Sequence, residues 1–589
     1  MAMIRKVTLK NFKRFEDVTF DLAGHVVLAG PNNTGKTTLL QAIAAWTLAY
    51  SKWRELNDFN PRRNGYPWQD LERLAFSAVS LRSFDLLWHN RQRNEPLEIG
   101  VQVDGASMLT MEFRFRAAGQ MQAHPKSECG SETVSHPAYR LQATFVPAMA
   151  GLAREEMRLA DPEAIRYLLA QGRPGEVLRN LLVTAHRDQE AWRLLNATVH
   201  RMFGASLLPP VPGAPLECEF QQAAPDQVPV AGLPRLDIAS AGSGFLQVLL
   251  VLSLMLTQGD QEAQQVLLID EPDAHLHLLL QKTIYDELRS VAARRGAQLL
   301  VATHSEQVIE SAEPRELYLM YGKPRKVSDT SEQALLMQSL GALSHSDLLE
   351  ANGAVGVLYA EDFTDFAILD AFARVLGDDV ALRLLTVQLV RKRSRAPVPD
   401  GLGDVQPAKH WEMLQLVNPT LPAAELLDGD SKNHADESIT GNATRMQRLR
   451  WRYYEVESYL LHPSAWKRFV ESQVGGGPAA EAALEAAFAE MDRVFEAAFR
   501  TRPLAPSALE ERVLKTEPVS KTVIPAMLQA AGLNQFGKSR YFEIAQCFES
   551  DEVPHEVREK LNLLKFAFGL SRGPRTTAPA STGDGGARA

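Results

Sequence analysis

The feature that most constrains the fold is a loop in which two glycines, separated by four residues, are followed directly by a lysine and a threonine. It spans residues 30–37, with the sequence GPNNTGKT. Residues 25–29 before it are almost entirely apolar, which predicts a short buried strand, and residues 38–45 after it predict a helix. A strand, a glycine loop and a helix in this order form a nest of backbone N–H groups for phosphate. The alternative, a glycine-containing turn before a core helix, is disfavoured by the complete pattern.

Two side chains of this loop have roles that their positions predict. Lys36 would reach the β- and γ-phosphates of a bound nucleotide, and Thr37 would be a ligand of Mg²⁺. The helix that follows adds the positive end of its dipole at the same place. We therefore expect ATP and Mg²⁺ as cofactors, with nucleotide contacts from the loop and the first helical turn: Gly30, Asn32, Asn33, Gly35, Lys36, Thr37 and Thr38.

Composition and charge place the chain among ordinary globular proteins. Its 589 residues are enough for about two to four domains, and 45% hydrophobic residues is a normal value. A net charge of -9 argues against a basic surface, although a local basic groove remains compatible with it. The three cysteines are far apart, which favours a reducing compartment over disulfides or a zinc cluster. The N-terminus turns polar at once, and the longest apolar run, 245–255, is too short for a bilayer. We expect a cytoplasmic protein that has no membrane contact.

A second motif supplies carboxylates. Residues 266–269 are continuously apolar, as in a parallel strand buried on both faces, and they end in Asp270 and Glu271. The carboxyl ends of such strands face the ligand. Asp270 would hold Mg²⁺ through water, and Glu271 would be the general base that polarises the attacking water. The alternative is a core strand that merely ends in an acidic turn. It is disfavoured because this strand follows the phosphate-binding loop at Lys36 in the order that a nucleotide site requires.

These segments resemble the heads of recombination and chromosome-maintenance ATPases of the ABC type. Those heads begin with a strand, an "NF(K/R)xF" corner and the loop "GxNxxGKTTLL", which match Asn11, Phe12, Lys13, Phe15 and residues 30–40 here. The resemblance implies an α/β fold with a P-loop ATPase head. It also implies a homodimer, or a larger homo-oligomer, that forms through the heads.

The family's signature loop, "(L)SxGQ", has a partial match in this sequence. Ser240 and Gly242 fit the pattern, whereas Ser243 replaces the usual Gln or Glu. In the family this loop closes over the γ-phosphate of ATP bound to the partner subunit, a task that suits a helix N-terminus. Taken alone the match is weak, because glycine and serine loops before helices are common.

Residues 298–303 predict another buried strand, and His304 follows it. The resemblance makes His304 the switch histidine that senses the γ-phosphate, although a histidine after a strand is more often structural. His275 and His277 lie where the family has its D-loop. For these two we favour structural or subunit contacts over metal ligation.

A second group of acidic residues follows two later apolar segments. Residues 354–360 predict a strand that leads into Glu361 and Asp365, and residues 424–427 predict a strand that leads into Asp428 and Asp430. This order resembles the topoisomerase–primase (Toprim) domain, whose first motif is "EGxxD"; here Asp362 takes the place of the glycine. Carboxylates at adjacent strand ends suit one or two Mg²⁺ or Mn²⁺ ions for phosphodiester cleavage. The resemblance implies the following metal ligands or their close support: Glu361, Asp365, Asp428 and Asp430, with Glu457 from a later segment.

Two acidic turns in an α/β domain are the alternative to that site. Residues 391–395 add four cations, which suit a phosphate backbone or equally a solvated loop.

The domains expected in order are an ABC-type ATPase domain at 1–325 with an insertion at about 53–229, a linker at 326–353, a Toprim-like domain at 354–470, a helical C-terminal region at 471–570 and a disordered tail at 571–589.

The whole arrangement resembles the overcoming-lysogenisation-defect (OLD) nucleases and related bacterial antiphage ATPases. The resemblance implies an ATP-regulated, metal-dependent endonuclease for DNA or RNA, in which Glu271, His304, Glu361, Asp428 and Asp430 are catalytic. A separate effector or a phage trigger protein is a further partner that it suggests. The alternative is an ATPase sensor or scaffold whose Toprim-like domain binds nucleic acid or an effector without cutting. A DNA-repair ATPase head is weaker, because no long heptad coiled coil is present.

Overall fold

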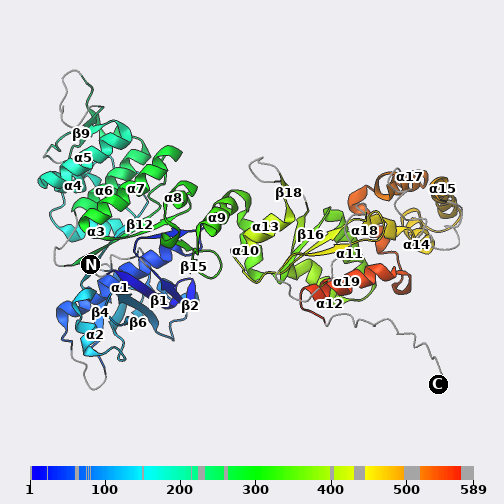
Figure 1. The fold of residues 1–589 in the computed structure, drawn as a ribbon, viewed down its shortest axis with the longest axis horizontal. Coiled ribbons are helices and arrows are strands. Elements are labelled where there is room, and N and C mark those ends of the chain that lie inside the picture. Colours follow the sequence, from blue (N-terminus) through cyan, green and yellow to red (C-terminus); the bar gives the residue numbers. More distant parts are fainter. Residues whose placement is uncertain are drawn as a thin grey trace, which may run out of the picture. The chain divides into compact units, whose positions relative to one another are not determined.

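The computed structural model describes most of the chain, which folds into two compact units (Figure 1). Unit 1 is Met1–Leu340 and unit 2 is Gly341–Ala589. The described residues are 3–571 without 23, 60–64, 74–75, 77–78, 80, 149–150, 212, 214, 223–232, 258–262, 395, 398–403, 430–438, 440–444 and 496–517. Nearly all of the predicted tail, from residue 572 onward, lies outside them.

The core of unit 1 is a six-stranded sheet in which the P-loop strand has a central place. Five of its strands are parallel and the edge strand β15 is antiparallel. The strand β3 is buried along its whole length because it is covered on both faces. The order across the sheet is β15 (Arg325–Lys326), β14 (Leu317–Leu319), β3 (Val26–Ala29), β13 (Gln298–Thr303), β12 (Gln264–Asp270) and β8 (Leu141–Val146).

A second sheet in unit 1 is antiparallel and begins with the N-terminal hairpin. One edge of β1 pairs with β2, and its other edge pairs with β5. The helix α1 (Lys36–Leu56) packs against strands of both sheets, which is why its buried residues surround it rather than forming one stripe. The order is β2 (Phe15–Asp21), β1 (Ile4–Phe12), β5 (Leu97–Val103), β6 (Leu109–Ala117), β7 (Gln120–Pro125) and β4 (Gln69–Glu72).

The structure divides the predicted insertion at 53–229 into three parts. Strands β4 to β7 complete the antiparallel sheet, because the free edge of β1 needs a hydrogen-bonding partner. Strand β8 belongs to the parallel sheet, so it is part of the ATPase core. Only the remainder forms a helical lobe, with α3 (Pro162–Ala170), α4 (Leu178–Arg187), α5 (Gln189–Phe203), β9 (Ser206–Leu207) and β10 (Glu219–Gln221).

The lobe packs on α6 (Ser243–Thr257), the most apolar helix of unit 1. Both α4 and α5 contact α6, and α6 also contacts α7 (Leu278–Arg295) and β8 (Figure 1). Because protein surrounds it on several sides, α6 has apolar residues on every face. No helix in the described part of the chain is long and apolar enough to cross a membrane.

The segment predicted as a linker is mostly helical. It contains α9 (Thr330–Ala342) and α10 (His345–Gly353), and the boundary between the two units falls within α9. A capping box between Ser344 and Asp347 starts α10, which satisfies backbone N–H groups that a helix leaves free.

Unit 2 is built on a four-stranded parallel sheet. The order is β17 (Leu389–Arg393), β16 (Gly356–Ala360), β20 (Ala423–Leu427) and β21 (Gln447–Arg450). All five residues of β16 are buried, as expected for a central parallel strand. Besides α10, the α-helices in the described part of unit 2 are α11 (Phe363–Val375), α12 (Asp379–Arg383), α13 (Pro407–Leu414), α14 (Pro463–Val474), α15 (Pro478–Val494), α17 (Ile524–Ala530), α18 (Phe542–Ala545) and α19 (His555–Ala567).

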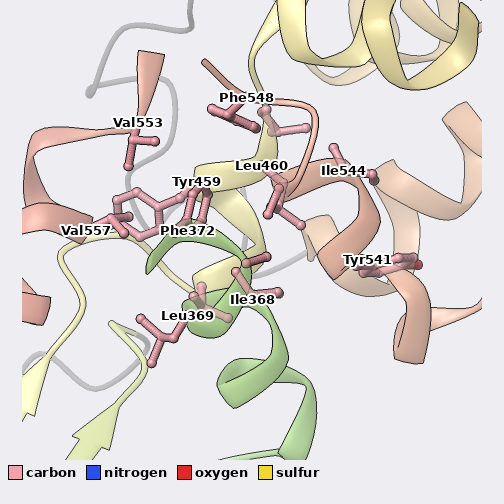
Figure 2. Packing of buried hydrophobic residues seen from close by; sticks show 14 of the residues in the cluster. Ile368, Leu369, Phe372, Tyr459, Leu460, Tyr541, Ile544, Phe548, Val553 and Val557 are labelled. Carbon is pink, nitrogen blue, oxygen red and sulfur yellow. The ribbon is translucent and has the colours of Figure 1, made fainter. Parts of the chain in front are cut away.

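The Toprim-like and C-terminal helical regions expected from the sequence share one hydrophobic core. Figure 2 shows Ile368, Leu369 and Phe372 of α11 beside Tyr459 and Leu460, together with residues of α18 and α19. The ring centroids of Phe372 and Phe548 are 5.3 Å apart in an edge-on arrangement. The C-terminal helices are therefore part of the folded unit that carries the acidic motifs.

Candidate functional site

The predicted P-loop connects β3 to α1, and its second glycine is required by two independent constraints. Gly35 has a φ of 101°, in the left-handed region that favours glycine. A Cβ atom there would lie 2.5 Å from Cζ of Phe15 and 2.7 Å from Cδ of Arg14. The corner between β1 and β2 therefore packs directly against the loop. At position 35, no residue larger than glycine fits between the corner and the loop.

Lys36 is 4% exposed and its ammonium lies inside the loop. The Nζ atom donates to the carbonyl oxygens of Gly30 at 2.6 Å and Pro31 at 2.9 Å, and it is 3.9 Å from Glu271. Burial lowers the pKa of Lys36, and nearby carboxylates oppose that effect. A buried ammonium within a ring of backbone groups is suited to binding a phosphate.

Thr37 and Asp270 come together across the sheet. The Thr37 hydroxyl donates to both carboxylate oxygens of Asp270, at 3.0 and 2.9 Å. Burial raises the pKa of Asp270 to about 6, and the Thr37 hydrogen bond opposes this. A hydroxyl and a carboxylate side by side are hard oxygen donors of the kind that Mg²⁺ prefers, so the residues fit the metal that the sequence implies.

Glu271 and His304 form a pair at the ends of adjacent strands. Nδ1 of His304 is 2.7 Å from Oε2 of Glu271, and this hydrogen bond is the main cause of the raised pKa of His304. Glu271 has a φ of 51°, an uncommon backbone conformation for a glutamate. Its backbone N–H donates to the carbonyl of Ala302 at 2.8 Å, which fixes that conformation.

Asp273 supports this pair and was not singled out from the sequence. The Thr303 hydroxyl donates to Asp273 at 2.7 Å, and the backbone N–H of Ser305 donates to the Thr303 hydroxyl at 2.9 Å. These bonds hold the residues on either side of His304. The exposed His275 has a φ of 65° in the turn before α7. Among the described residues, no three His, Cys, Asp or Glu side chains form a ready-made metal site.

A pocket of about 380 Å³ lies over the loop, and it reveals two cations that the sequence reasoning did not assign. Lys13 and Arg14 come from the "NF(K/R)xF" corner, which was the signal that could have identified them. Burial lowers the pKa of Lys13 to about 8, and its ammonium donates to Gln41 at 2.5 Å. The residues lining the pocket are Lys13, Arg14, Asn32, Asn33, Thr34, Gly35, Lys36, Thr37, Thr38 and Glu271.

The predicted signature loop does not line this pocket. Ser240 ends the short helix η7 (Ile238–Ser240), and both Ser240 and Gly242 are exposed just before α6. A Cβ atom on Gly244 would lie 2.9 Å from the carbonyl oxygen of His275. The start of α6 therefore touches the turn that carries His275 within the same chain.

The first acidic motif of unit 2 lies where β16 meets α11. Asp362 caps the helix: its side chain accepts from the N–H of Phe363 at 2.7 Å, and its own N–H donates to Asp365 at 3.0 Å. The backbone of Asp362 is extended, with a φ of −137°, so this position does not require the glycine of the Toprim pattern. Glu361 is exposed and Asp365 is buried, and burial raises the pKa of Asp365 to about 6.

The second acidic motif follows β20, the strand beside β16. Burial raises the pKa of Asp428 to about 9, and the charges of Glu361, Asp365 and Glu457 add to the effect. The structure thus brings four of the five predicted acidic residues within electrostatic range of one another. Asp430, the fifth, lies outside the described residues. Crowded carboxylates of this kind attract cations, but those in the described part of the chain do not form a ready-made metal site.

A lysine from the C-terminal helices reaches this acidic cluster. Nζ of Lys538 is 3.1 Å from Oε1 of Glu457, which is 1% exposed, and 3.6 Å from Oδ2 of Asp362. Burial raises the pKa of Glu457 to about 7, and Lys538 opposes this rise. Nothing in the sequence signalled Lys538, because it lies 81 residues after Glu457 (538 − 457).

The basic segment 391–395 extends from the edge strand β17, and three of its cations are paired with carboxylates. Arg391 makes two hydrogen bonds to Asp370, at 3.0 and 2.6 Å, and Lys392 contacts Asp347. Nε of Arg393 is 3.9 Å from Asp362. All three pairs lie within unit 2, and the pair of Arg393 borders the acidic cluster.

The loop at Lys36, the pair Thr37–Asp270 and the pair Glu271–His304 define a P-loop nucleotide site. Two family models match the same unit. Residues 3–110 match a model described as an AAA ATPase domain. Residues 231–310 match a model described as an AAA domain, putative AbiEii toxin, Type IV TA system. Unit 1 is therefore a P-loop ATPase of the AAA class that binds ATP.

Several solved structures of Smc head domains are similar at low identity. An Smc head from Pyrococcus furiosus, bound to the C-terminal domain of ScpA, shares 15% identity, with 58% of this chain and 100% of that chain covered and a TM-score of 0.35. The SMC head from Thermotoga maritima shares 15% identity over 54% and 94% of the two chains, with a TM-score of 0.29. No curated protein matches the chain. The assignment to the AAA class therefore comes from the family models and the site.

Proposed function

We propose that this ATPase regulates a metal-dependent nuclease site of the Toprim type in unit 2. The observation that carries the proposal is the gathering of four carboxylates: Glu361 and Asp428 follow the parallel strands β16 and β20, and Asp365 of α11 and Glu457 of the short helix Val456–Leu460 lie near them. Asp365 and Glu457 are buried members of this group, and carboxylates rarely gather in this way without a functional reason, because their mutual repulsion destabilises the fold. Asp430 would complete the ligand set.

In the ATPase site, each described side chain would have one role. Lys36, Lys13 and Arg14 would bind the phosphates, and Thr37 with Asp270 would hold Mg²⁺ directly or through water. Glu271 would accept a proton from the attacking water. The Glu271–His304 distance of 2.7 Å gives the histidine a direct way to report a change at the γ-phosphate. Asn32, Asn33 and Thr38 would contact the nucleotide from the pocket wall.

Complete hydrolysis would require two heads. Ser240 and Gly242 are exposed and do not line the Lys36 pocket, which suits a loop that acts on nucleotide bound to a second copy. ATP would then join two heads, and its hydrolysis would release them. The homodimer, or a larger homo-oligomer, follows from this arrangement.

In unit 2, the carboxylates would hold Mg²⁺ or Mn²⁺, which activates water and stabilises the leaving oxygen in phosphodiester cleavage when it is bound. Lys538 and Arg393 lie at the edge of the carboxylates and would attract the phosphate backbone of DNA or RNA. Asp362 would hold both cations in place while it caps α11.

A role in antiphage defence is the biological setting we propose, on the resemblance to OLD-family nucleases. The description of one matching family model names a putative toxin, which is in keeping with a chain that damages nucleic acid when triggered. A phage protein or a separate effector would supply the trigger.

The decisive experiment measures cleavage of plasmid DNA and of bulk tRNA with Mg²⁺ or Mn²⁺, each with and without ATP. Asp428→Asn is the test variant, and Asp379→Asn, at the exposed start of α12, is the matched control. We expect the control to cut like the wild type and Asp428→Asn to lose cleavage. Cutting that survives in Asp428→Asn would refute the nuclease site.

A scaffold without nuclease activity is the second candidate. Lys538 already neutralises part of the acidic cluster through Glu457 and Asp362, which favours a site that needs no metal. Calorimetric titration with Mn²⁺ separates the two candidates. Binding that Asp428→Asn abolishes supports the nuclease, and identical heats for the two proteins support the scaffold.

A further inference from the structure

Arg179 is a buried arginine that links the helical lobe of unit 1 to the segment before the signature loop. It lies in the first turn of α4 and is 3% exposed. Its guanidinium donates to the carbonyl of Ala153 at 3.0 Å through Nη1 and to Oδ1 of Asp237 at 3.2 Å through Nη2. A buried guanidinium held by a carboxylate is a strong and directional contact.

The lobe end of this link is held rigidly. Glu156 is 3% exposed and accepts from the backbone N–H groups of Arg179 at 2.8 Å and Asn180 at 2.7 Å. The Asn180 side chain donates to the same carboxylate at 2.7 Å. Glu156 thus caps the first turn of α4 and fixes the backbone position of Arg179. A displacement of α4 must therefore move the guanidinium with it.

The other end of the link determines the shape of the loop. Oδ1 of Asp237, the atom that accepts from Arg179, also accepts from the N–H of Ala239 at 2.7 Å. The carbonyl oxygen of Asp237 accepts from the Ser240 hydroxyl at 2.6 Å. Asp237 is in turn held by β11 (Leu236–Asp237), which pairs with β10 of the lobe. The position of Ser240 therefore depends on one aspartate that the lobe holds by two routes.

We propose that Arg179 is a positioning residue for the Ser240–Gly242 loop, so that the helical lobe sets the rate of ATP hydrolysis at the nucleotide of a second copy. This inference rests on the proposed pairing of the heads. A ligand that moves α4 would change turnover without touching the nucleotide, because a misplacement of about 1 Å at a reacting site can lower a rate by about a hundredfold.

The test compares Arg179→Gln, Arg179→Lys and Asp237→Asn with the wild type, using the whole chain. Asp237→Asn is the gentler variant, because its amide oxygen can still accept from Ala239. Arg173→Gln is the matched control: Arg173 is an exposed arginine of the same lobe whose side chain pairs with nearby Glu176 and Gln171. The measurements are kcat for ATP at several protein concentrations, and the Kd of a fluorescent ATP analogue.

Arg179→Gln and Asp237→Asn should each lower kcat at least fivefold, whereas the Kd stays within twofold of the wild type. The double variant should be no slower than the slower single variant, because both remove one contact. Arg179→Lys, which keeps the charge, should recover part of the rate, and Arg173→Gln should leave it unchanged.

Two results would overturn the inference in different ways. If wild-type turnover per chain rises with protein concentration but Asp237→Asn retains its kcat, only the role of Arg179 is refuted. If wild-type turnover per chain does not depend on concentration down to the range in which light scattering shows monomers, heads do not act on each other, and both the pairing and this inference fail.

Discussion

Replacing Asp428 by asparagine should make the metal-free protein more stable while it removes the proposed nuclease activity. The pKa of Asp428 is raised to about 9 by burial and by Glu361, Asp365 and Glu457, so at neutral pH its carboxyl is protonated in the folded protein. In the unfolded chain the same carboxyl is ionised. Folding must therefore take up a proton, and this opposes folding increasingly as the pH rises.

The size of the effect follows from that pKa. At pH 7.5, taking up a proton on a group whose unfolded pKa is near 4 costs at most roughly 5 kcal/mol, at 1.36 kcal/mol for each pH unit. The neighbouring carboxylates share this energy and relax, so we expect about half of it, ~2 kcal/mol, to be regained in Asp428→Asn. Asparagine is the right replacement because it resembles the neutral acid in shape and charge.

The assay is thermal unfolding of unit 2, with EDTA or with Mn²⁺, at several pH values. Without metal, Asp428→Asn should unfold at a higher temperature than the wild type at pH 8, and the difference should shrink towards pH 4 and below, where the aspartate becomes protonated in the unfolded chain as well. Mn²⁺ should stabilise the wild type more at pH 8 than at pH 6, because bound metal must displace the proton. Asp428→Asn should lose that response, and Asp379→Asn should keep it. A variant no more stable than the wild type at pH 8 would refute the reasoning.

Three further outcomes follow from other sites. Glu271→Gln should keep ATP binding but lower turnover at least about a hundredfold, the usual contribution of a general base, and light scattering should show an ATP-dependent dimer that persists. Gly35→Ala should destabilise unit 1 by about 2–4 kcal/mol, from its positive φ and the overlap with Phe15, and ATP affinity should fall with it. Burial lowers the pKa of His410 to about 4, so this histidine by itself should remove up to roughly 3 kcal/mol of stability from unit 2 between pH 6.5 and 4, against the opposite trend from Asp428. His410→Phe should remove this pH dependence, and it should cost about 1 kcal/mol of stability because the hydrogen bond to Tyr359 is lost. A pH profile of stability that is the same in His410→Phe and the wild type would contradict the prediction.

Much of the nucleotide site could be predicted from the sequence because the residues that form it lie in short, contiguous segments. The loop around Lys36 and the strand before Asp270 each combine an apolar run with a fixed order of polar residues. Parallel strands then bring those ends to one edge of the sheet, as the hydrogen bonds between Thr37 and Asp270 illustrate. The strained backbone of Glu271 has no sequence signal, because it is set by its neighbours.

Contacts between distant segments could not be predicted. Lys538 meets Glu457 only because the C-terminal helices pack against α11, and a single sequence does not reveal such packing. The division of the region 53–229 was missed for a similar reason. Strands β5 and β8 look alike as apolar segments, yet one completes the antiparallel sheet and the other the parallel sheet. The cations of the segment 391–395 likewise gave no hint that Arg391 would pair with Asp370.

The late position of Lys538 in the chain has a consequence during protein synthesis. The ribosome completes Glu361, Asp365, Asp428 and Glu457 well before the lysine that faces Glu457 exists. Until residue 538 and the helices around it have emerged, the nascent carboxylates lack this counter-charge and repel one another, and the shared core that includes Phe372 and Phe548 is incomplete. Unit 2 therefore reaches its final form only after its core residues up to Phe568 have been translated. Copies of the chain that stop before residue 538 should therefore lack the lysine that faces Glu457 in the acidic cluster.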